Sequence, residues 1–491
     1  MAALDAKRVV ILGAGVSGHT AAQYLTREFK GSPVEVVVIS PNKQWNWIPS
    51  NIWVGTGAMP GKKVVFDLPP VYRKMGAVFH QAKATEIHPE GDGEGTKPYV
   101  VFERTEKGKE GQVDQIDYDY LINATGPQLN FEKTPGLGPD GYSLSVCTKD
   151  HAVEAAEELQ KIIRELKATG EKKTLVVGMG HGTCTCEGAA FEYAFNVDDM
   201  LRKNGVRDKA ELIYFTNEVT LGDFGVGGMQ FKDNGYLTDS RLWTESIFRE
   251  RGVHAVVGAC ATKIEEGKIY YETLDGSGHE LDFDFAMLLP PFSGVPLKGV
   301  GPKGEDIGEK LFAPNGMMKV DATYGKTNPD DWVAADWPET YQNPVYDNIW
   351  AVGIAFAPPH PISIPNASPN GVPIAPAPPR TGMPSGTMGR IVAETIIDRI
   401  KNPETAEPHR ASLTRMGAAC VASTGVGLKA GSAASMLMHP VVPNYELYPE
   451  TGRSKFTTGD VGLSGHWIKL MLHFMFIWKA RSRPFWFLIP E

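Results

Sequence analysis

Apolar residues form two short runs that each end in a glycine-rich turn and continue with helical spacing. The first run covers residues 8–12, its turn spans 13–18, and a helical pattern follows through Phe29. The second run covers residues 174–177, and a helix is expected over 187–204 after its turn. Short apolar runs bounded by glycine are typical of buried strands in a parallel sheet. The pattern predicts an α/β fold with two Rossmann-like dinucleotide-binding domains.

The first turn has the spacing of a dinucleotide fingerprint. Gly13, Gly15 and Gly18 stand as G-x-G-x-x-G, and a second strand is expected over 34–39. These glycines allow a tight turn and let a pyrophosphate approach the N-terminus of the helix. Ser40 stands where an acidic ribose ligand is usual. Its absence weakens the case for NAD binding more than the case for FAD binding. A polar side chain is then expected to contact the ribose: Ser40, Asn42 or Lys43.

The second turn departs from the fingerprint. Thr183 takes the third glycine position, Cys184 and Cys186 begin the helix, and Thr216-Asn217 follows the next strand where an acid is expected. Thiols therefore fit this site better than a nicotinamide. A helix N-terminus lowers the pKa of a cysteine, so Cys186 is expected to be a reactive thiol. The alternative is that Cys184 and Cys186 only pack as small residues and carry no chemistry. A zinc site is not expected, because the sequence has no second cysteine pair to complete a set of ligands.

Several later segments fit a flavoprotein with two such domains. The tryptophan-rich stretch 45–53 serves either core packing or a flavin ring, and the strand after Tyr118 ends in Ala-Thr-Gly126. Paired strands are expected near residues 255–285. A strand over 348–353 is expected to return the chain to the first domain, before a proline-rich loop (358–386) and a helix (387–400). A long proline-rich loop in a folded protein is usually functional.

Together these segments resemble the sulfide:quinone oxidoreductases, membrane-associated FAD enzymes. The matching residues are Gly13–Gly18, Ile48–Asn51, Tyr118–Pro127, Ser145–His151, Cys186–Glu192, Pro290–Gly294, Val352-Gly353, Pro379–Gly382 and the aromatic C-terminus. The resemblance implies a sulfur-bridged pair, Cys186 and Cys420, beside FAD, with a third thiol at Cys147. It also places His151 and Glu192 near the sulfide channel. The implied FAD contacts are Gly13, Gly15, Gly18, Ser40, Pro49, Ser50, Asn51, Ala124, Thr125, Gly126, Gly353 and Arg380.

The residues by themselves leave some of these roles open. Cys420 has the surroundings of a buried core cysteine, and Cys260 is expected to be structural. His151 could cap a charged helix or handle protons, and Glu192 could be a surface carboxylate. Arg380 stands for the family's usual lysine near the flavin and would stabilise a reduced, anionic flavin. Asp223 stands for a family histidine, which changes how protons would be handled.

Composition narrows the class of protein. The 491 residues carry a formal net charge of −9 and no dense basic run, so nucleic acid is not an expected partner. Five cysteines at scattered spacings do not predict a disulfide scaffold. The N-terminus runs directly into a strand, so no signal peptide is expected, and no apolar run reaches the length of a transmembrane helix.

The C-terminus predicts an amphipathic helix that lies in a membrane interface. Apolar residues from Leu463 to Trp478 recur at helical spacing, the cations Lys479, Arg481 and Arg483 follow, and Phe485–Ile489 is again apolar. A helix docked on the body of the protein is the alternative. The predicted organisation is an FAD domain (1–148), a second Rossmann-like domain with the thiols (149–312), a return to the FAD domain (313–400), and a C-terminal region with Cys420 (401–491).

The expected function is FAD-dependent oxidation of sulfide to polysulfide sulfur with reduction of a membrane quinone. The expected partners are sulfide, ubiquinone or menaquinone, the membrane surface, and further copies of the chain. Two alternatives stay open: an NADH:quinone oxidoreductase of the same architecture, and a non-catalytic membrane flavoprotein that senses redox state. Thr183 argues against the first of these.

Overall fold

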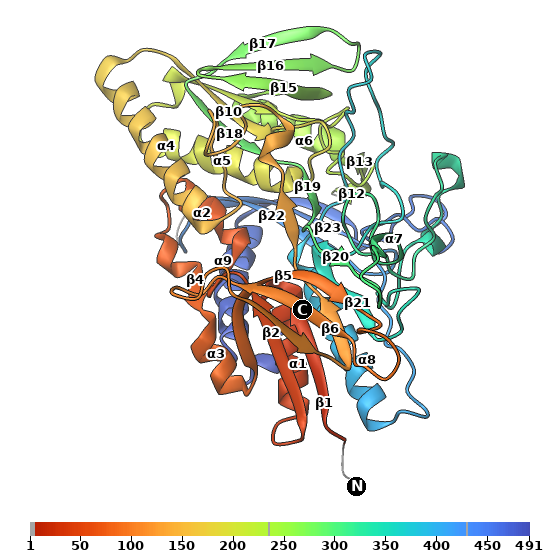
Figure 1. Cartoon of the computed structure of the whole chain (residues 1–491). Helices are drawn as coiled ribbons and strands as arrows, with labels where there is room; N and C mark the ends of the chain where they lie inside the picture. Colours follow the sequence, from red (N-terminus) through yellow and green to blue (C-terminus); the bar gives the residue numbers. More distant parts are fainter. Residues whose placement is uncertain (1–4, 234–235, 429–430) are drawn as a thin grey trace.

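A computed structural model describes residues 5–233, 236–428 and 431–491. Its first sheet is assembled from two distant parts of the chain (Figure 1). β1 (Lys7–Leu12) lies between the parallel strands β2 (Val34–Ser40) and β8 (Tyr120–Asn123), and β21 (Ile349–Ala351) pairs with β8. The predicted return of the chain to the first sheet is therefore confirmed. The first four residues, which the expectation about a signal peptide includes, lie outside the description.

The sheet continues beyond β2 and is covered by two long helices. β5 (Val78–His88) pairs with β2, and β6 (Tyr99–Arg104) and β7 (Val113–Asp117) extend the sheet in antiparallel fashion. α1 (Val16–Glu28) packs against α8 (Gly382–Lys401). α8 begins at Gly382, earlier than the predicted helix over 387–400, so the irregular part of the proline-rich loop is shorter than expected.

The second sheet is the one that follows the cysteine-containing turn. Four parallel strands stand in the order β14 (Val253–Val256), β11 (Ala210–Phe215), β10 (Lys173–Met179) and β18 (Phe285–Leu289). α4 (Lys149–Thr169), α5 (Glu187–Lys203) and α6 (Ser240–Arg251) accompany it. A separate antiparallel sheet tops this region in Figure 1: β15 (Ala259–Glu265), β16 (Lys268–Thr273) and β17 (Gly278–Asp282). The predicted α/β fold with two Rossmann-like sheets is confirmed.

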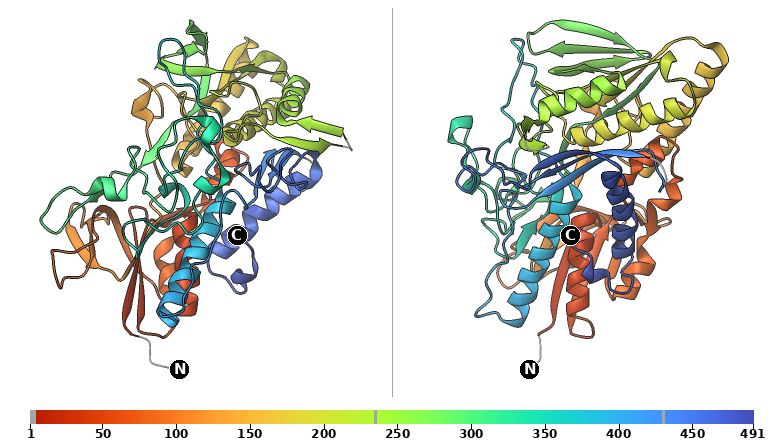
Figure 2. Two further views of the ribbon diagram at one scale, coloured as in Figure 1. Left: turned by 90° about the vertical axis from the view of Figure 1, so that its right-hand side faces the viewer. Right: turned by 180° about the vertical axis from the view of Figure 1, so that it is seen from behind.

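The C-terminal region joins the two halves. β22 (Ala418–Thr424), β23 (Ser432–Met438) and β24 (Thr458–Gly462) form an antiparallel sheet that leads into α9 (Leu463–Ala480). β22 packs on α5, and α9 packs on β22 and β23. Figure 2 shows these blue strands crossing between the two halves of the molecule. The shorter elements are β3 (Gln44–Asn46), α2 (Asn51–Gly55), β4 (Val65–Asp67), α3 (Leu68–Met75), β9 (Pro127–Leu129), β12 (Gln230–Asp233), β13 (Tyr236–Asp239), β19 (Phe292–Gly294), β20 (Lys298–Gly299) and α7 (Gly308–Leu311).

Candidate functional site

The turn after β1 is tightly packed on one side and open on the other. A Cβ at Gly13 would lie 2.1 Å from the carbonyl oxygen of Ala124, and one at Gly18 would lie 2.2 Å from that of Gly13. No atom lies within 4 Å of the Cβ position at Gly15. Gly15 is also the N-cap of α1 and has no side-chain cap. The first N–H groups of α1 therefore face open space, which suits a pyrophosphate.

The other residues expected to contact a dinucleotide surround this turn. Ser40 is buried at the end of β2, and Gly126 has a φ of 73° after β8. A Cβ at Gly353 would lie 2.2 Å from the Oγ of Ser17, on α1. The Thr125 hydroxyl donates to Asn123 over 2.8 Å. Glycines at each close approach and an open helix N-terminus fit the ADP half of FAD.

The turn after β10 is instead covered by the proline-rich loop. A Cβ at Gly182 would lie 1.9 Å from the carbonyl oxygen of Pro373. The N–H groups of Ala375 and Ala377 donate to the carbonyls of Gly182 and Cys184 over 2.8 and 2.9 Å. The Asn217 amide donates to the same two carbonyls. The polar backbone of this turn is thus satisfied by the chain itself.

The thiols of Cys147, Cys186 and Cys420 gather at the start of α5. Cys186 is the N-cap residue of α5, with a φ of 73°. Cys420 lies on β22, and its Sγ sits 2.6 Å from where a Cβ at Gly188 would stand. The charge of Cys186 acts on the pKa of both other thiols, which places the three near one another. All are free thiols, so the sulfur bridge between Cys186 and Cys420 stays a prediction.

The remaining two cysteines have structural contacts. Cys184 is buried and donates through its Sγ to the carbonyl of Leu289 over 3.1 Å. Cys260 is buried on β15, where its Sγ accepts from the N–H of Gly182 over 3.1 Å. Both sulfurs therefore help to fix the covered turn.

The expected low pKa of Cys186 is wrong. Burial, and after it the neighbouring Glu187, raise the pKa of this thiol to about 11, although some of its surface is exposed. The backbone N–H and guanidinium of Arg380 act in the opposite direction. Burial also raises the pKa of Cys147 and of Cys420 to about 12. Desolvation here outweighs the favourable end of the helix dipole.

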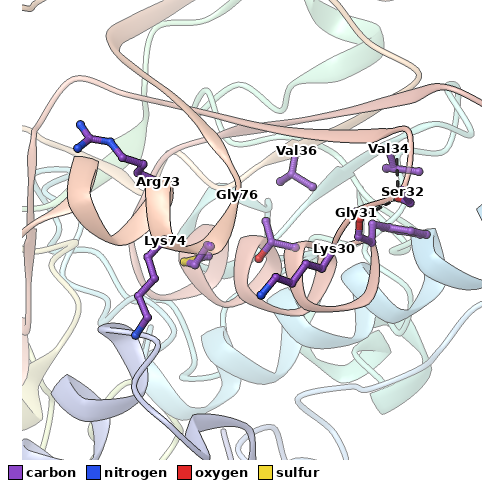
Figure 3. Close-up of a pocket in the computed structure, with 11 residues that line it drawn as sticks. Lys30, Gly31, Ser32, Val34, Val36, Arg73, Lys74 and Gly76 are labelled. Carbon is purple, nitrogen blue, oxygen red and sulfur yellow. Dashed lines mark hydrogen bonds between the residues drawn. The ribbon is translucent and has the colours of Figure 1, made fainter.

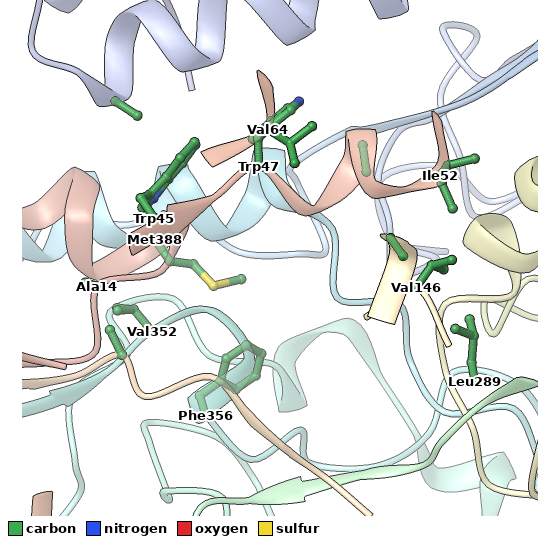
Figure 4. Packing of buried hydrophobic residues seen from close by; sticks show 14 of the residues in the cluster. Ala14, Trp45, Trp47, Ile52, Val64, Val146, Leu289, Val352, Phe356 and Met388 are labelled. Carbon is green, nitrogen blue, oxygen red and sulfur yellow. The ribbon is translucent and has the colours of Figure 1, made fainter. Parts of the chain in front are cut away.

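Arg380 is a partly buried cation without a carboxylate partner among the described residues. Its guanidinium lies 4.9 Å from the centre of the Phe356 ring and contacts the Phe356 carbonyl over 3.4 Å. Burial lowers its pKa to about 10. Figure 4 shows Phe356 and Val352 facing apolar side chains of the other elements, including Trp47 and Ile52. A fixed positive charge at an apolar surface can stabilise an anion brought there.

Glu192 is not the surface carboxylate that one alternative proposed. Its side chain is 5% exposed and forms a 2.9 Å ion pair with Lys469 of α9. It also accepts from the N–H and the hydroxyl of Ser423, on β22. The Trp53 indole donates to the same hydroxyl over 2.9 Å. Glu192 therefore ties α5, the strand that carries Cys420, and the C-terminal helix together.

His151 stands apart from this network. Its backbone N–H is capped by the Thr148 hydroxyl, its ring meets Phe131 edge-on at 5.9 Å, and its Nδ1 is buried without a partner among the described residues. Burial lowers its pKa. No hydrogen bond or ion pair of the described residues joins His151 to the thiols, so its role in proton handling stays a prediction.

α9 turns several polar side chains inward and leaves several large apolar side chains exposed. Ser50 and His473 are joined by a 2.9 Å hydrogen bond, and His466, Lys469 and His473 are buried. The exposed residues include Trp467, Ile468, Met471, Phe474 and Trp478. A surface helix in a globular protein normally has the reverse pattern. α9 is nevertheless docked on the body of the protein, as the alternative expected, because it packs on β22 and β23 and its residues Leu470, Phe476 and Ile477 pack against the core. Binding of the exposed apolar residues to a membrane stays a prediction.

One detail of the predicted membrane face also needs correction. Lys479 is 3% exposed and pairs with Glu491, so it cannot serve as an interfacial cation. Arg483 lies on the outer side, 4.9 Å from the Trp478 ring. Within the described part of the chain, no helix is both long and apolar enough to span a bilayer.

A pocket of about 330 Å³ lies at the carboxyl ends of α1 and α3 (Figure 3). Lys30, Arg73 and Lys74 border it, and Lys74 donates to the carbonyl of Ser482. These cations are suited to the partial negative charge of two helix ends. The pocket contains none of the thiols and none of the residues expected to contact FAD.

Sequence reasoning missed two buried acids near Cys186, Glu187 and Glu218. Glu187, Glu218 and Asp223 lie together, because each of the last two raises the pKa of Glu187. Glu218 directly follows Thr216-Asn217, so an acid lies one residue beyond the position where an acidic ribose ligand is expected. Its side chain is buried and bonds to Tyr214, Thr216 and Phe224.

Comparison with known proteins agrees with this arrangement. A family model described as pyridine nucleotide-disulphide oxidoreductase matches residues 7–343. The sulfide-quinone reductase of Aquifex aeolicus (strain VF5) is 29% identical over 478 residues, which cover 97% of this chain and 92% of that protein. The X-ray structure of the sulfide:quinone oxidoreductase from Aquifex aeolicus has a TM-score of 0.74 at 28% identity, covering 97% and 92%. NDH2 from Plasmodium falciparum, at 12% identity and a TM-score of 0.62 over 99% and 97% of the chains, shares the fold.

Proposed function

The chain belongs to the pyridine nucleotide-disulphide oxidoreductase family, and from that premise we propose that it oxidises sulfide and passes the electrons through FAD to a quinone. It is a sulfide:quinone oxidoreductase in fold and in chemistry, as its similarity to the Aquifex aeolicus enzyme over 97% of the chain supports. The observation that carries the proposal is the approach of Cys420, from β22, to the first turn of α5 beside Cys186.

The residues proposed to hold FAD come from both halves of the first domain. The turn Gly13–Gly18 and the N-terminus of α1 would bind the pyrophosphate, and Ser40 the ribose. Ala124–Gly126, Gly353 and the segment Pro49–Asn51 would border the rest of the cofactor. Arg380 would face the flavin ring. FAD, when bound, supplies the two-electron acceptor between sulfide and quinone.

The thiols are proposed to carry the sulfur chemistry. Hydrosulfide attacks a Cys186–Cys420 bridge, a new S–S bond forms as a persulfide on one cysteine, and the other cysteine leaves as a thiolate. Arg380 stabilises a thiolate at Cys186, since its charge and its backbone N–H both lower the pKa of that thiol. Cys147 would accept or release the growing sulfur chain, with His151 and Glu192 at the edge of the site.

An NADH:quinone oxidoreductase is the alternative from the same family. A nicotinamide dinucleotide would need the turn at Gly182 for its pyrophosphate, and residues 373–377 already bond to that turn. Displacing them would break the two backbone hydrogen bonds from Ala375 and Ala377. This favours sulfide as the electron donor.

Peripheral membrane binding is proposed for the outward apolar face of α9 and for the segment after it. Phe474 is 60% exposed, Phe485 71% and Leu488 70%, which is a poor surface for water but a good one for a lipid interface. Quinone would enter beside this face, near Phe356. Assembly into a homo-oligomer and the domain boundaries at residues 148, 312 and 400 stay predictions.

Substitution of the cysteines tests the chemistry. Cys186→Ser and Cys420→Ser should each abolish sulfide-driven flavin reduction while FAD remains bound, and Cys260→Ser is the matched control. Full activity in both variants would sink the mechanism.

A second test addresses the membrane face. Phe474→Ser combined with Leu488→Ser should weaken binding to quinone-containing vesicles, whereas Leu237→Ser, an equally exposed change on β13, should not. Truncation of α9 is unsuitable, because Lys469 pairs with Glu192 and His473 bonds to Ser50, a proposed FAD contact. Unchanged vesicle binding in the first variant would place the anchor elsewhere.

A further inference from the structure

Exposed cations surround the apolar segment that follows α9. They form a basic rim, which consists of Arg27 and Lys30 at the end of α1, Arg73 and Lys74 at the end of α3, and Arg483 after α9. Among the described residues, none of these side chains forms an ion pair with a carboxylate. The whole chain carries a formal net charge of −9. A local excess of unpaired cations in an acidic chain points to an anionic partner.

Direct contacts place the basic rim against the segment after α9. The Lys74 ammonium donates to the carbonyl of Ser482 over 3.0 Å. The guanidinium of Arg27 lies 3.9 Å from the centre of the Phe487 ring. Arg483 belongs to the segment itself. The cations and the apolar side chains of this segment therefore share one surface.

The pocket between the ends of α1 and α3 opens inside the basic rim. Lys30, Arg73 and Lys74 border its volume of about 330 Å³, and Figure 3 shows Lys30 and Lys74 extending in the same direction. Within the described chain, Lys30 and Arg73 make no hydrogen bond, so both charges are available to a ligand. The lining also includes the apolar side chains of Phe29 and Met75. Cations beside apolar side chains suit a phosphate that is attached to a lipid.

The acids closest to the basic rim along the chain are already paired. Glu28, next to Arg27, pairs with Lys401 over 2.5 Å. Glu491, in the same C-terminal segment as the exposed rings, pairs with Lys479 over 2.6 Å. These carboxylates therefore do not neutralise the rim, and its positive charge stays beside the exposed apolar side chains.

We propose that the basic rim binds the phosphate of an anionic phospholipid, with the head group in the pocket between α1 and α3. The inference rests on the proposed membrane binding. The exposed Phe485 and Leu488 would enter the apolar layer, and the cations would stay at the level of the head groups. A free phosphate has the same charge, but the adjoining apolar segment favours a lipid. The protein would then select anionic membranes over neutral ones.

The test measures flotation of the FAD-loaded protein with two kinds of vesicle, phosphatidylcholine alone and phosphatidylcholine mixed with phosphatidylglycerol. The wild type should bind the anionic vesicles more tightly, and added salt should reduce the difference because it screens exposed charges. Equal binding of the wild type to both vesicles at low salt would overturn the proposal.

Substitution of the two cations without contacts locates the effect. Lys30→Gln combined with Arg73→Gln should weaken binding to the anionic vesicles about 30-fold, which corresponds to about 1 kcal/mol for each cation near an anionic surface. Binding to phosphatidylcholine vesicles should not change. If the double variant does not fold, Lys30→Glu changes the charge by the same amount on one side chain and should produce the same selective loss. Wild-type binding to anionic vesicles in a folded variant would overturn the proposal.

The matched control is Lys83→Gln combined with Lys172→Gln. These lysines are also exposed and lie on β5 and between α4 and β10, so the control removes the same net charge elsewhere. It should bind both vesicles as the wild type does. An equal loss in the control and in the rim variant would mean that only the net charge matters, and would overturn the site.

Calorimetry with inorganic phosphate distinguishes a lipid from a ligand in solution. Without vesicles, phosphate should give no saturable binding, because the proposed affinity needs the apolar segment in the membrane as well. Saturable binding of phosphate alone would assign the pocket to a soluble anion and overturn the lipid.

A last readout separates this inference from the proposed function. Sulfide-driven flavin reduction needs no vesicle, so the rim variant should keep the wild-type rate. Failure of the proposed function would appear as no flavin reduction by sulfide in the wild type, whatever the vesicles show. A selective loss of flavin reduction in the rim variant would contradict a role confined to the membrane.

Discussion

The two glycine-rich turns differ in what covers them, although both join a parallel strand to a helix. At the first turn, the space over Gly15 contains no protein atom within 4 Å. At the second turn, the carbonyl of Pro373 stands 1.9 Å from the Cβ position of Gly182, and backbone bonds hold the loop there. The same local geometry therefore leaves room for the proposed cofactor in one half and is covered by a segment of its own chain in the other. The covered turn becomes a rigid support for thiols.

Substitution at the first turn should have the largest effect. Gly13→Val places a side chain against the Ala124 carbonyl at a φ of 99°, so FAD binding should be lost. Gly15→Ala meets no protein atom and should fold normally. If the pyrophosphate occupies that space, Gly15→Ala should still weaken FAD binding, as measured by the flavin retained after gel filtration. Full FAD occupancy in both variants would contradict an FAD site at this turn.

Substitution at the second turn should affect chemistry and leave FAD in place. The Cβ of Gly188→Ala would meet the Cys420 sulfur at 2.6 Å and push it from Cys186. The rate of sulfide-driven flavin reduction should fall about 100-fold, the usual cost of misplacing a reacting group by about 1 Å. Stability should not fall, since alanine favours a helix over glycine.

The matched control for this variant is Gly278→Ala, on the exposed strand β17, where a Cβ meets no atom. Stopped-flow measurement of flavin reduction compares the two. Equal rates in both variants would mean that Cys420 does not act at the start of α5.

The smallest effect is expected in the pH dependence of stability. Burial raises the pKa of Glu218 from 4.5 to about 7 in the folded protein. An acid with a raised pKa stabilises the fold below its unfolded pKa, and this contribution is lost as the pH rises through about 7. Glu218→Gln should remove the loss, so between pH 5 and 8 its melting temperature should fall less than that of the wild type, by about 3 °C. Parallel curves for the two proteins would contradict a buried, neutral Glu218.

Much of this arrangement could be predicted because it depends on local pattern. The strand runs near Val9 and Val176, the glycine spacing and the helical repeat of the C-terminus each specify an element within a few residues. The outward apolar face of α9 followed from the same kind of pattern. The position of Cys420 came from family resemblance, since its own neighbours only indicate a buried residue.

The remainder depends on contacts between distant segments. The pKa values of Cys186 and Glu187 are both raised first by burial, which depends on contacts between segments distant in the sequence, such as residues 373–377 bonded to the same turn. From the local sequence, the helix dipole is expected to lower the pKa of Cys186. Burial in the folded protein raises this pKa instead. The prediction that Lys479 is an interfacial cation was wrong for the same reason. Its partner Glu491 lies beyond a turn that periodicity does not predict.

The most direct test of the central claim is an anaerobic titration of the oxidised, FAD-loaded protein, first with NADH and then with sulfide, followed by flavin absorbance. The open first turn and covered second turn predict no bleaching by NADH and stoichiometric bleaching by sulfide, with reoxidation when quinone is added. Rapid bleaching by NADH without sulfide would contradict the account, because it would require a nicotinamide where residues 373–377 lie.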